Sequence, residues 1–415
     1  MGFQISYSSP VTRQVKGLYM KYIVLVGDGM ADYPIPELGN KTPLEVADTT
    51  NMDTIARKGM SGTVNTIPDN LPPGSDVANL SVVGYDPMKY YTGRGPLEAG
   101  SVGVRINPGE VAYRCNIVTV KDGVMVDYSS GHISSSESEE LIKSLKDNLD
   151  NDEITFYAGV SYRHLLVHKN GSELLDCTPP HDITDREYEP YLPKGDGQEI
   201  ILDLMKKSLP ILSDHPINKK RIADGKNPGN IIWPWGQGRA PSMPTFAEKY
   251  GLTGSVISAV DLIKGIGFYA GLDIINVPGA TGYLDTNYLG KAEYALESLR
   301  EKDFVWVHVE APDEAAHAGN LKAKIKAIED FDSKVVGTVL NKIDKSGEEY
   351  VLLVLPDHLT PISVRTHVHG PVPYAVCGAR IKSDNVDRFC EASAESGSMK
   401  FVYGHEFLPY LLKLV

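Results

Sequence analysis

The chain has 415 residues, enough for two domains, and its 42% hydrophobic and 23% charged residues are typical of a soluble globular protein. The net charge of −13 argues against nucleic acid or an anionic membrane as a partner. No apolar run is long enough to span a bilayer, and residues 1–19 lack the apolar core of a signal peptide. With four widely spaced cysteines and no CxxC pair, these features predict a cytoplasmic protein with reduced thiols.

Predicted strands and helices alternate from residue 20 onwards. Residues 22–26 form an apolar run that ends in Gly27-Asp28-Gly29, and residues 51–58 have helical spacing that Gly59 closes. The alternation returns in the second half, with expected strands at 255–260, 273–277, 304–309 and 350–355 and expected helices at 291–300 and 321–340. Repeated units of this kind predict an α/β fold with a mostly parallel sheet flanked by helices.

The middle of the chain has a different pattern. Short alternating strands are expected at 111–120, 123–128, 154–160 and 164–168, among many prolines and loops. We therefore expect an N-terminal extension at 1–19, an α/β domain formed by 20–92 and 240–415, and an inserted α+β domain at 93–239. The Pro/Gly-rich stretch 227–244 is expected to be the hinge through which the chain returns.

Acidic and histidine residues lie at the ends of several predicted strands. These are Asp28, the pair Asp313 and His317, the pair Asp357 and His358, and either His367 or His369. Each group alone also fits an ordinary turn or helix cap. Together they predict a metal site, because ligands bind at this edge of open α/β sheets and because divalent ions take oxygen and imidazole ligands. A pair of metals there would suit phosphoryl transfer.

Ser75 lies in PPGSDVANLSVVGYDP, which is expected to be a loop followed by a short helix. A serine in this place is most often only a helix N-cap. The start of a helix also offers free N–H groups that stabilise a phosphoryl group. A neighbouring metal would lower the pKa of the hydroxyl, so we expect Ser75 to be the nucleophile.

A series of motifs follows one order along the chain: VGDGMAD, PPGSDVANLSVVGYDP, YYTGRGPLEA, YRHLLV, PPHD, SAVDLIKGIG, PGATGYLDTNY, PDEAAHAG and PDHLTP. In these motifs the sequence resembles the archaeal-type, cofactor-independent phosphoglycerate mutases of the alkaline phosphatase superfamily. The resemblance extends from about residue 20 to the C-terminus. It implies a phosphatase-like α/β domain interrupted by an inserted domain that covers the substrate.

The resemblance also assigns roles to single residues. It implies that Ser75 is phosphorylated during turnover and that no 2,3-bisphosphoglycerate is needed. One divalent ion would be held by Asp28, Ser75, Asp357 and His358, and the other by Asp313, His317 and His367. The family spacing, four residues before the proline of PVP, selects His367 over His369. Manganese is the expected metal, and zinc, magnesium or cobalt remain alternatives.

The expected reaction is the interconversion of 3-phosphoglycerate and 2-phosphoglycerate, a step of glycolysis and gluconeogenesis. The cations expected to hold this small phosphorylated substrate are Arg94, Arg163, His164, Arg239 and Lys264, although each also fits a surface or packing role. In HVEAPDEAAHAG, PPHDIT and WPWGQGRAP the sequence most resembles a bacterial branch of the family, some of whose members are proposed homoserine kinases. A metal-dependent homoserine kinase, or a phosphatase on the same scaffold, is therefore the alternative. Neither the general acid and base nor the oligomeric state is indicated.

Overall fold

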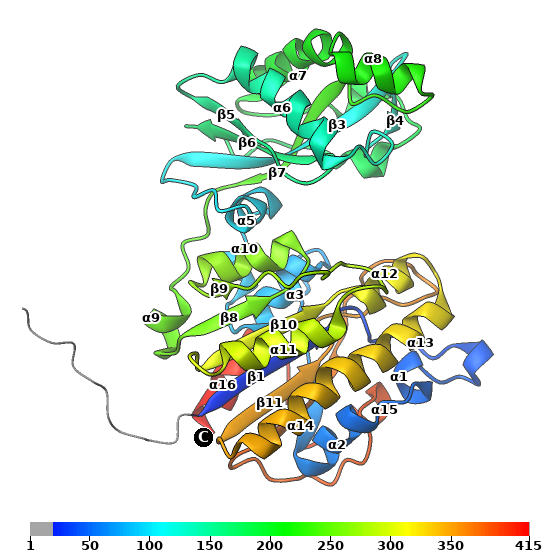
Figure 1. Ribbon diagram of the computed structural model, residues 1–415, viewed down its shortest axis with the longest axis vertical. Coiled ribbons are helices and arrows are strands. Elements are labelled where there is room, and N and C mark those ends of the chain that lie inside the picture. The colour runs from blue at the N-terminus through cyan, green and yellow to red at the C-terminus, as the bar shows by residue number, and fades with distance from the viewer. Residues whose placement is uncertain (1–19, 415) are drawn as a thin grey trace, which may run out of the picture.

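The computed structural model describes residues 20–414, so the extension expected at 1–19 lies outside the described residues. The chain forms two lobes, each built around its own sheet, that are stacked along the long axis of the molecule (Figure 1). Across residues 20–414, no helix has both the length and the apolar character needed to cross a bilayer.

The larger lobe contains an eight-stranded sheet in the order β13-β2-β12-β11-β1-β10-β8-β9. Its strands are β1 (Lys21–Gly27), β2 (Met60–Val64), β8 (Gly254–Ile257), β9 (Asp273–Ile274), β10 (Phe304–Val309), β11 (Tyr350–Leu355), β12 (Val372–Gly378) and β13 (Met399–Phe401). Strand β1 is parallel to both of its neighbours, β10 and β11, whereas β12 is antiparallel to β11 and β2. The mostly parallel sheet predicted from the sequence is therefore confirmed.

Helices cover both faces of this sheet, as expected for strands that are apolar throughout. Ile23 and Leu25 pack on one face with side chains of α2, α11, α13 and α14, and Tyr22, Val24 and Val26 pack on the other with α3, α10 and α16. The helices of this lobe are α1 (Pro43–Val46), α2 (Thr50–Lys58), α3 (Ser75–Val82), α4 (Pro87–Tyr90), α9 (Phe246–Tyr250), α10 (Asp261–Tyr269), α11 (Tyr288–Ser298), α12 (Ala311–His317), α13 (Leu321–Asp330), α14 (Gly337–Ser346), α15 (Glu391–Ala394) and α16 (Phe407–Lys413).

The helix expected at 321–340 is longer and less regular than predicted. A π-helical segment, Phe331–Val336, joins α13 to α14. The strand expected at 273–277 is shorter than predicted and comprises only Asp273–Ile274.

The smaller lobe contains a five-stranded antiparallel sheet in the order β4-β3-β6-β5, with β7 also paired to β3. Its strands are β3 (Glu110–Lys121), β4 (Val124–Asp127), β5 (Ile154–Tyr157), β6 (Arg163–Lys169) and β7 (Ile231–Gly238). Helices α6 (Ser135–Leu149), α7 (Gln198–Ser213) and α8 (Pro216–Ala223) lie together on one side of this sheet (Figure 1). Leu141, Leu145, Ile201 and Leu204 of α6 and α7 join the strands in one hydrophobic core.

The stretch 227–244 is not the simple hinge that its prolines and glycines predicted, because it contains strand β7. Ile232, Trp233 and Trp235 of this strand are buried in the core of the smaller lobe. Pro234 is tolerated because β7 pairs with β3 alone among the described strands, and an edge strand makes ladder hydrogen bonds on one side only.

Helix α5 (Arg94–Ser101) lies between the lobes (Figure 1). It packs against α10 of the larger lobe and against β3 and β7 of the smaller one. The approach to α10 is close: a Cβ atom on Gly265 would overlap the carbonyl oxygen of Leu97. An ion pair also crosses between the lobes, since Arg163 Nη2 lies 4.0 Å from Asp261 Oδ2.

Candidate active site

The sheet topology brings most of the candidate residues to one edge of the larger sheet. Strands β1, β10 and β11 are parallel and end there, and the antiparallel strand β12 begins there. Strand β2 is antiparallel to β12 and therefore also ends at this edge. The residues carried there are Asp28 after β1, Ser75 at the start of α3, Asp313 and His317 on α12, Asp357 and His358 after β11, and His367 before β12.

The first group of residues is centred on the imidazole of His358. Its Nε2 atom lies 3.0 Å from Ser75 Oγ, 3.3 Å from Asp28 Oδ1 and 3.6 Å from Asp357 Oδ2. Asp28, Asp357 and His358 are buried, and their ligand atoms all lie within 4.8 Å of one another. A single divalent ion can be bound by such a set of atoms.

The second group is centred on Asp313. Its Oδ2 atom lies 3.0 Å from His317 Nε2, as the i,i+4 spacing on α12 predicts, and 3.6 Å from His367 Nε2. The two imidazoles approach each other to 3.1 Å between their Nε2 atoms. His369 points elsewhere, because its Nε2–H donates to the carbonyl oxygen of Leu71 at 2.9 Å. The histidine beside Asp313 is thus His367.

The electrostatics of these groups fit divalent cations. Burial, together with the nearby carboxylates of Asp357 and Asp313, raises the pKa of Asp28 well above its ordinary value. Burial also opposes the ionisation of Asp313, but hydrogen bonds from His317 and His367 hold its pKa well below the ordinary value. Asp28 Oδ1 is buried without a hydrogen-bond donor among the described residues. A bound cation would satisfy this oxygen and offset the repulsion between the carboxylates.

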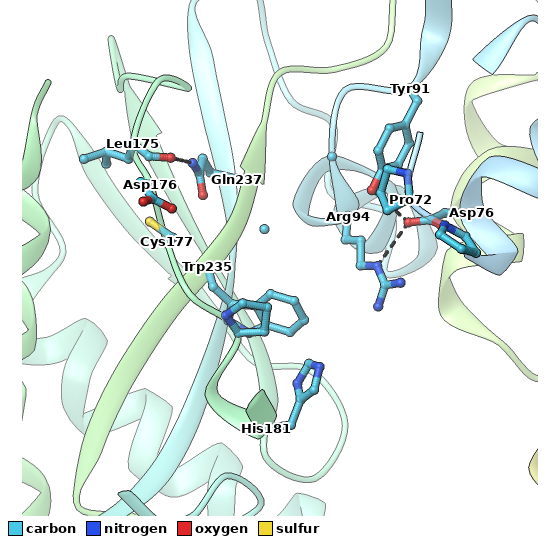
Figure 2. A pocket seen from close by; sticks show the side chains of 14 residues that line it. Pro72, Asp76, Tyr91, Arg94, Leu175, Asp176, Cys177, His181, Trp235 and Gln237 are labelled. Carbon is cyan, nitrogen blue, oxygen red and sulfur yellow. Dashed lines mark hydrogen bonds and ion pairs between the residues drawn. The ribbon is translucent and has the colours of Figure 1, made fainter. Parts of the chain in front are cut away.

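A cavity of about 420 Å³ lies between the two lobes. Its walls include Asp76, Tyr91 and Arg94 from the side of Ser75, and Asp176, His181 and Trp235 from the smaller lobe (Figure 2). Arg94 Nε lies 3.1 Å from Asp76 Oδ2, which also accepts a hydrogen bond from the Tyr91 hydroxyl at 2.9 Å. Asp76, which follows the candidate nucleophile Ser75, thus orients the guanidinium of Arg94 in the cleft.

Comparison with known proteins gives the family. Residues 56–218 match a family model described as 2,3-bisphosphoglycerate-independent phosphoglycerate mutase. A curated protein of this name from Methanosarcina acetivorans is 54% identical over 398 residues, which are 95% of this chain and 100% of the relative. The chain belongs to the 2,3-bisphosphoglycerate-independent phosphoglycerate mutase family.

Other members of this phosphoglycerate mutase family support the assignment. A protein from Geobacter sulfurreducens, named a probable mutase of this type, is 50% identical over 95% of this chain and 100% of its own length. The solved cofactor-independent phosphoglycerate mutase from Thermoplasma acidophilum is 30% identical, with a TM-score of 0.65 over 95% of this chain and 99% of that one. A solved protein from Pyrococcus horikoshii has a TM-score of 0.83 at 30% identity, over 96% and 98% of the two chains. The names of these mutases favour the mutase prediction over the homoserine-kinase alternative.

The cations expected to bind substrate in this mutase-family chain lie in different surroundings. Arg94 lines the cleft, whereas Arg163 pairs with Asp261 and Arg239 Nε lies 3.2 Å from Glu173 Oε1. Lys264 is half-buried on α10.

His164 differs from these four cations because it is buried inside the smaller lobe. Its Nδ1 accepts a hydrogen bond from the Gly159 N–H at 3.1 Å, and burial lowers the pKa of the ring to about 3. The imidazole is therefore neutral and has no exposed edge for a substrate.

Two residues beside the first group were not predicted from the sequence. His308, on β10, is fully buried, and its Nε2 lies 3.1 Å from Asp28 Oδ2 and 3.7 Å from Asp357 Oδ2. Asn79, one turn after Ser75, donates from Nδ2 to Asp357 Oδ2 at 2.6 Å. The apolar run FVWVHV indicated only a buried strand. The one feature of the sequence that pointed to a site residue there was the histidine itself, His308, near the carboxyl end of the run.

Proposed function

We propose that this protein is an isomerase that interconverts 3-phosphoglycerate and 2-phosphoglycerate without 2,3-bisphosphoglycerate. The observation that carries the proposal is the position of the Ser75 hydroxyl. It lies 3.0 Å from His358 Nε2, among buried carboxylates and imidazoles and beside the cleft between the lobes. The proposal is further supported by membership of a family whose relatives are named for this reaction.

In the proposed mechanism, Ser75 Oγ attacks the phosphorus of the substrate in line. The P–O bond to the glycerate breaks, so phosphoserine and a glycerate hydroxyl are formed. The enclosed glycerate then turns, and its other hydroxyl takes the phosphoryl group back from Ser75. Because Ser75 begins the eight-residue helix α3, the helix dipole favours the negative charge of the phosphoserine.

Two divalent ions are the proposed cofactors, with manganese as the first choice and zinc, magnesium or cobalt as alternatives. One would be held by Asp28, Ser75, Asp357 and His358, and the other by Asp313, His317 and His367. When bound, such ions supply Lewis acidity that lowers the pKa of the serine hydroxyl and neutralises charge on the phosphoryl group.

The substrate is proposed to be held by cations and covered by the smaller lobe. Arg94, Arg163, Arg239 and Lys264 would bind its phosphate and carboxylate, whereas we assign no substrate contact to the buried His164. We propose that residues 93–239 form an inserted domain that closes over the cleft. Closure would exclude water, which would otherwise hydrolyse the phosphoserine and release phosphate. A cytoplasmic location would suit such a glycolytic enzyme.

The test replaces the nucleophile and a matched neighbour on the same helix. Ser75→Ala should lower the rate of 2-phosphoglycerate formation from 3-phosphoglycerate with Mn²⁺ by at least about 10³-fold, the scale of losses for catalytic nucleophiles. Ser81→Ala removes a buried hydroxyl from α3 that has no hydrogen-bond partner among the described residues, and it should leave the rate within about twofold. A Ser75→Ala enzyme that keeps its mutase rate would overturn the mechanism.

Parallel assays of the unmodified protein separate the alternative reactions. ATP and homoserine are supplied in one arm, and phosphate release from 3-phosphoglycerate is followed in another. Faster formation of phosphohomoserine than of 2-phosphoglycerate would overturn the proposal in favour of a kinase. Phosphate release faster than isomer formation would overturn it in favour of a phosphatase.

A further inference from the structure

Thr360 contacts both groups of candidate ligands. Its side chain is fully buried, and its Oγ1 donates a hydrogen bond to Asp313 Oδ1 at 2.6 Å. The same oxygen lies 3.1 Å from His358 Nδ1. Asp313 belongs to the second group and His358 to the first, so one hydroxyl links the two.

We propose that Thr360 is a positioning residue that fixes the tautomer of His358 and couples the two metal sites. This inference rests on the proposed two-metal function and deepens it. Thr360 is not itself a ligand in this proposal; it acts through the two residues that it contacts.

The tautomer of His358 follows from the number of protons shared among Asp313, Thr360 and His358. The hydroxyl of Thr360 has one proton, and the carboxylate of Asp313 can only accept a hydrogen bond, so that proton lies between them. The contact with His358 then requires a proton on His358 Nδ1, which donates to the hydroxyl oxygen. A neutral imidazole with its proton on Nδ1 has a lone pair on Nε2. That is the atom that faces Ser75 and Asp28 and would bind a metal.

The backbone of Thr360 is held in place by a buried ion pair. Lys324 Nζ donates to the Thr360 carbonyl oxygen at 2.9 Å and to Asp32 Oδ2 at 2.8 Å, and both charged side chains are buried. The N–H of Thr360 donates to the carbonyl oxygen of Ala31 at 3.2 Å. Gly29, with φ of 61°, leaves room for the hydroxyl, because a Cβ atom there would lie 2.7 Å from Thr360 Oγ1.

A shared hydroxyl makes the two ligand groups interdependent. If Asp313 rotates away, Thr360 loses its acceptor and is free to donate to His358 Nδ1 instead, which would shift the imidazole proton to Nε2. That tautomer cannot bind a metal through Nε2. Loss of the hydroxyl is therefore expected to weaken metal binding at both groups.

The first experiment measures the binding of Mn²⁺ alone to the metal-free protein by calorimetry. Thr360→Val removes the hydroxyl at nearly constant volume and should weaken binding by about 10- to 100-fold, the usual effect of losing a hydrogen-bond partner behind a ligand. Thr360→Ser keeps the hydroxyl and should stay within about threefold of the unmodified protein. Thr119→Val is the matched control, since its buried hydroxyl donates to Pro228 O at 2.7 Å in the smaller lobe; it should bind Mn²⁺ unchanged.

The second experiment observes the tautomer directly and does not depend on the folding of a variant. Nitrogen NMR of the metal-free, ¹⁵N-histidine-labelled protein should show His358 protonated at Nδ1, with its resonances assigned by their loss in His358→Gln. Protonation at Nε2 would overturn the proposal, as would a Thr360→Val protein that binds Mn²⁺ as tightly as the unmodified one. Failure of the unmodified protein to bind Mn²⁺, Zn²⁺, Mg²⁺ or Co²⁺ would instead overturn the two-metal function itself.

Discussion

Glu310 has an unusual environment at the beginning of α12. Burial, and then the neighbouring carboxylates of Glu314 and Asp313, raise its pKa to about 8, although Lys291 and Arg163 oppose the change. The folded protein therefore retains a proton that the unfolded chain releases near its ordinary pKa of 4.5. Because the folded state binds more protons between these two values, the stability that this proton contributes is lost as pH rises from about 4.5 to about 8.

Glu310→Gln should remove this pH dependence. In metal-free protein, the free energy of unfolding of the variant should match the unmodified protein at about pH 4, below the ordinary pKa, and exceed it at about pH 8 by about 1–3 kcal/mol. Urea unfolding at several pH values measures the difference. Glu301→Gln, at an exposed position, is the control and should give a curve parallel to that of the unmodified protein. If the free energy of unfolding of Glu310→Gln ran parallel to that of the unmodified protein across this pH range, the prediction would be wrong.

Single residues were predictable where local geometry fixes their positions. The i,i+4 spacing of Asp313 and His317 predicts a shared helix face, and their side chains lie 3.0 Å apart. His308 and Thr360 were not predictable in this way. Each contacts partners from distant parts of the chain, and neither a histidine in a strand nor a hydroxyl in a loop has a spacing that indicates such contacts.

The contact between α5 and α10 fixes how the two lobes meet. Alanine within a helix is ordinarily more stable than glycine, by about 0.5–1 kcal/mol. At Gly265 of α10 the added Cβ atom would overlap the Leu97 carbonyl oxygen of α5, and backbone atoms cannot move aside as a flexible side chain would.

Gly265→Ala should therefore destabilise the protein by about 1–3 kcal/mol, the usual cost of overpacking. Chemical denaturation measures the change. A gain in stability, which helix propensity alone predicts, would show that α5 moves away from α10 without cost.

Among the elements, the buried strands were the most predictable. The runs at 304–309 and 350–355 match β10 and β11, because continuous apolar residues are required wherever helices cover both faces of a sheet. Strand β7 was predicted as a hinge because prolines and glycines indicate loops. Its tryptophans are nevertheless buried against the smaller lobe, and this tertiary packing outweighs the local signal.

At the scale of the whole molecule, the cleft between the lobes predicts a change of shape on binding. Arg94 and His181, both within residues 93–239, line this cleft together with Asp76, the neighbour of Ser75 (Figure 2). A phosphorylated substrate that is held by Arg94 and reaches Ser75 would therefore draw the lobes together.

Small-angle scattering of the Ser75→Ala protein should show a smaller radius of gyration with Mn²⁺ and 3-phosphoglycerate than with Mn²⁺ alone. Glycerate without the phosphate serves as the control and should give a weaker effect. An unchanged radius of gyration at saturating substrate would argue against closure of the inserted domain.

The position of β1 has a consequence for how the chain folds during synthesis. This strand, near the N-terminus, lies at the centre of the larger sheet between β10 and β11, from the last third of the chain. Its hydrogen-bonding partners leave the ribosome long after it does, whereas the strands of the smaller lobe find their partners among one another. The smaller lobe is therefore expected to fold first, while β1 stays unpaired until β10 (Phe304–Val309) has been synthesised. Ser75 and the carboxylates and imidazoles around it are expected to assemble last, so an incomplete nascent chain would lack the proposed catalytic edge.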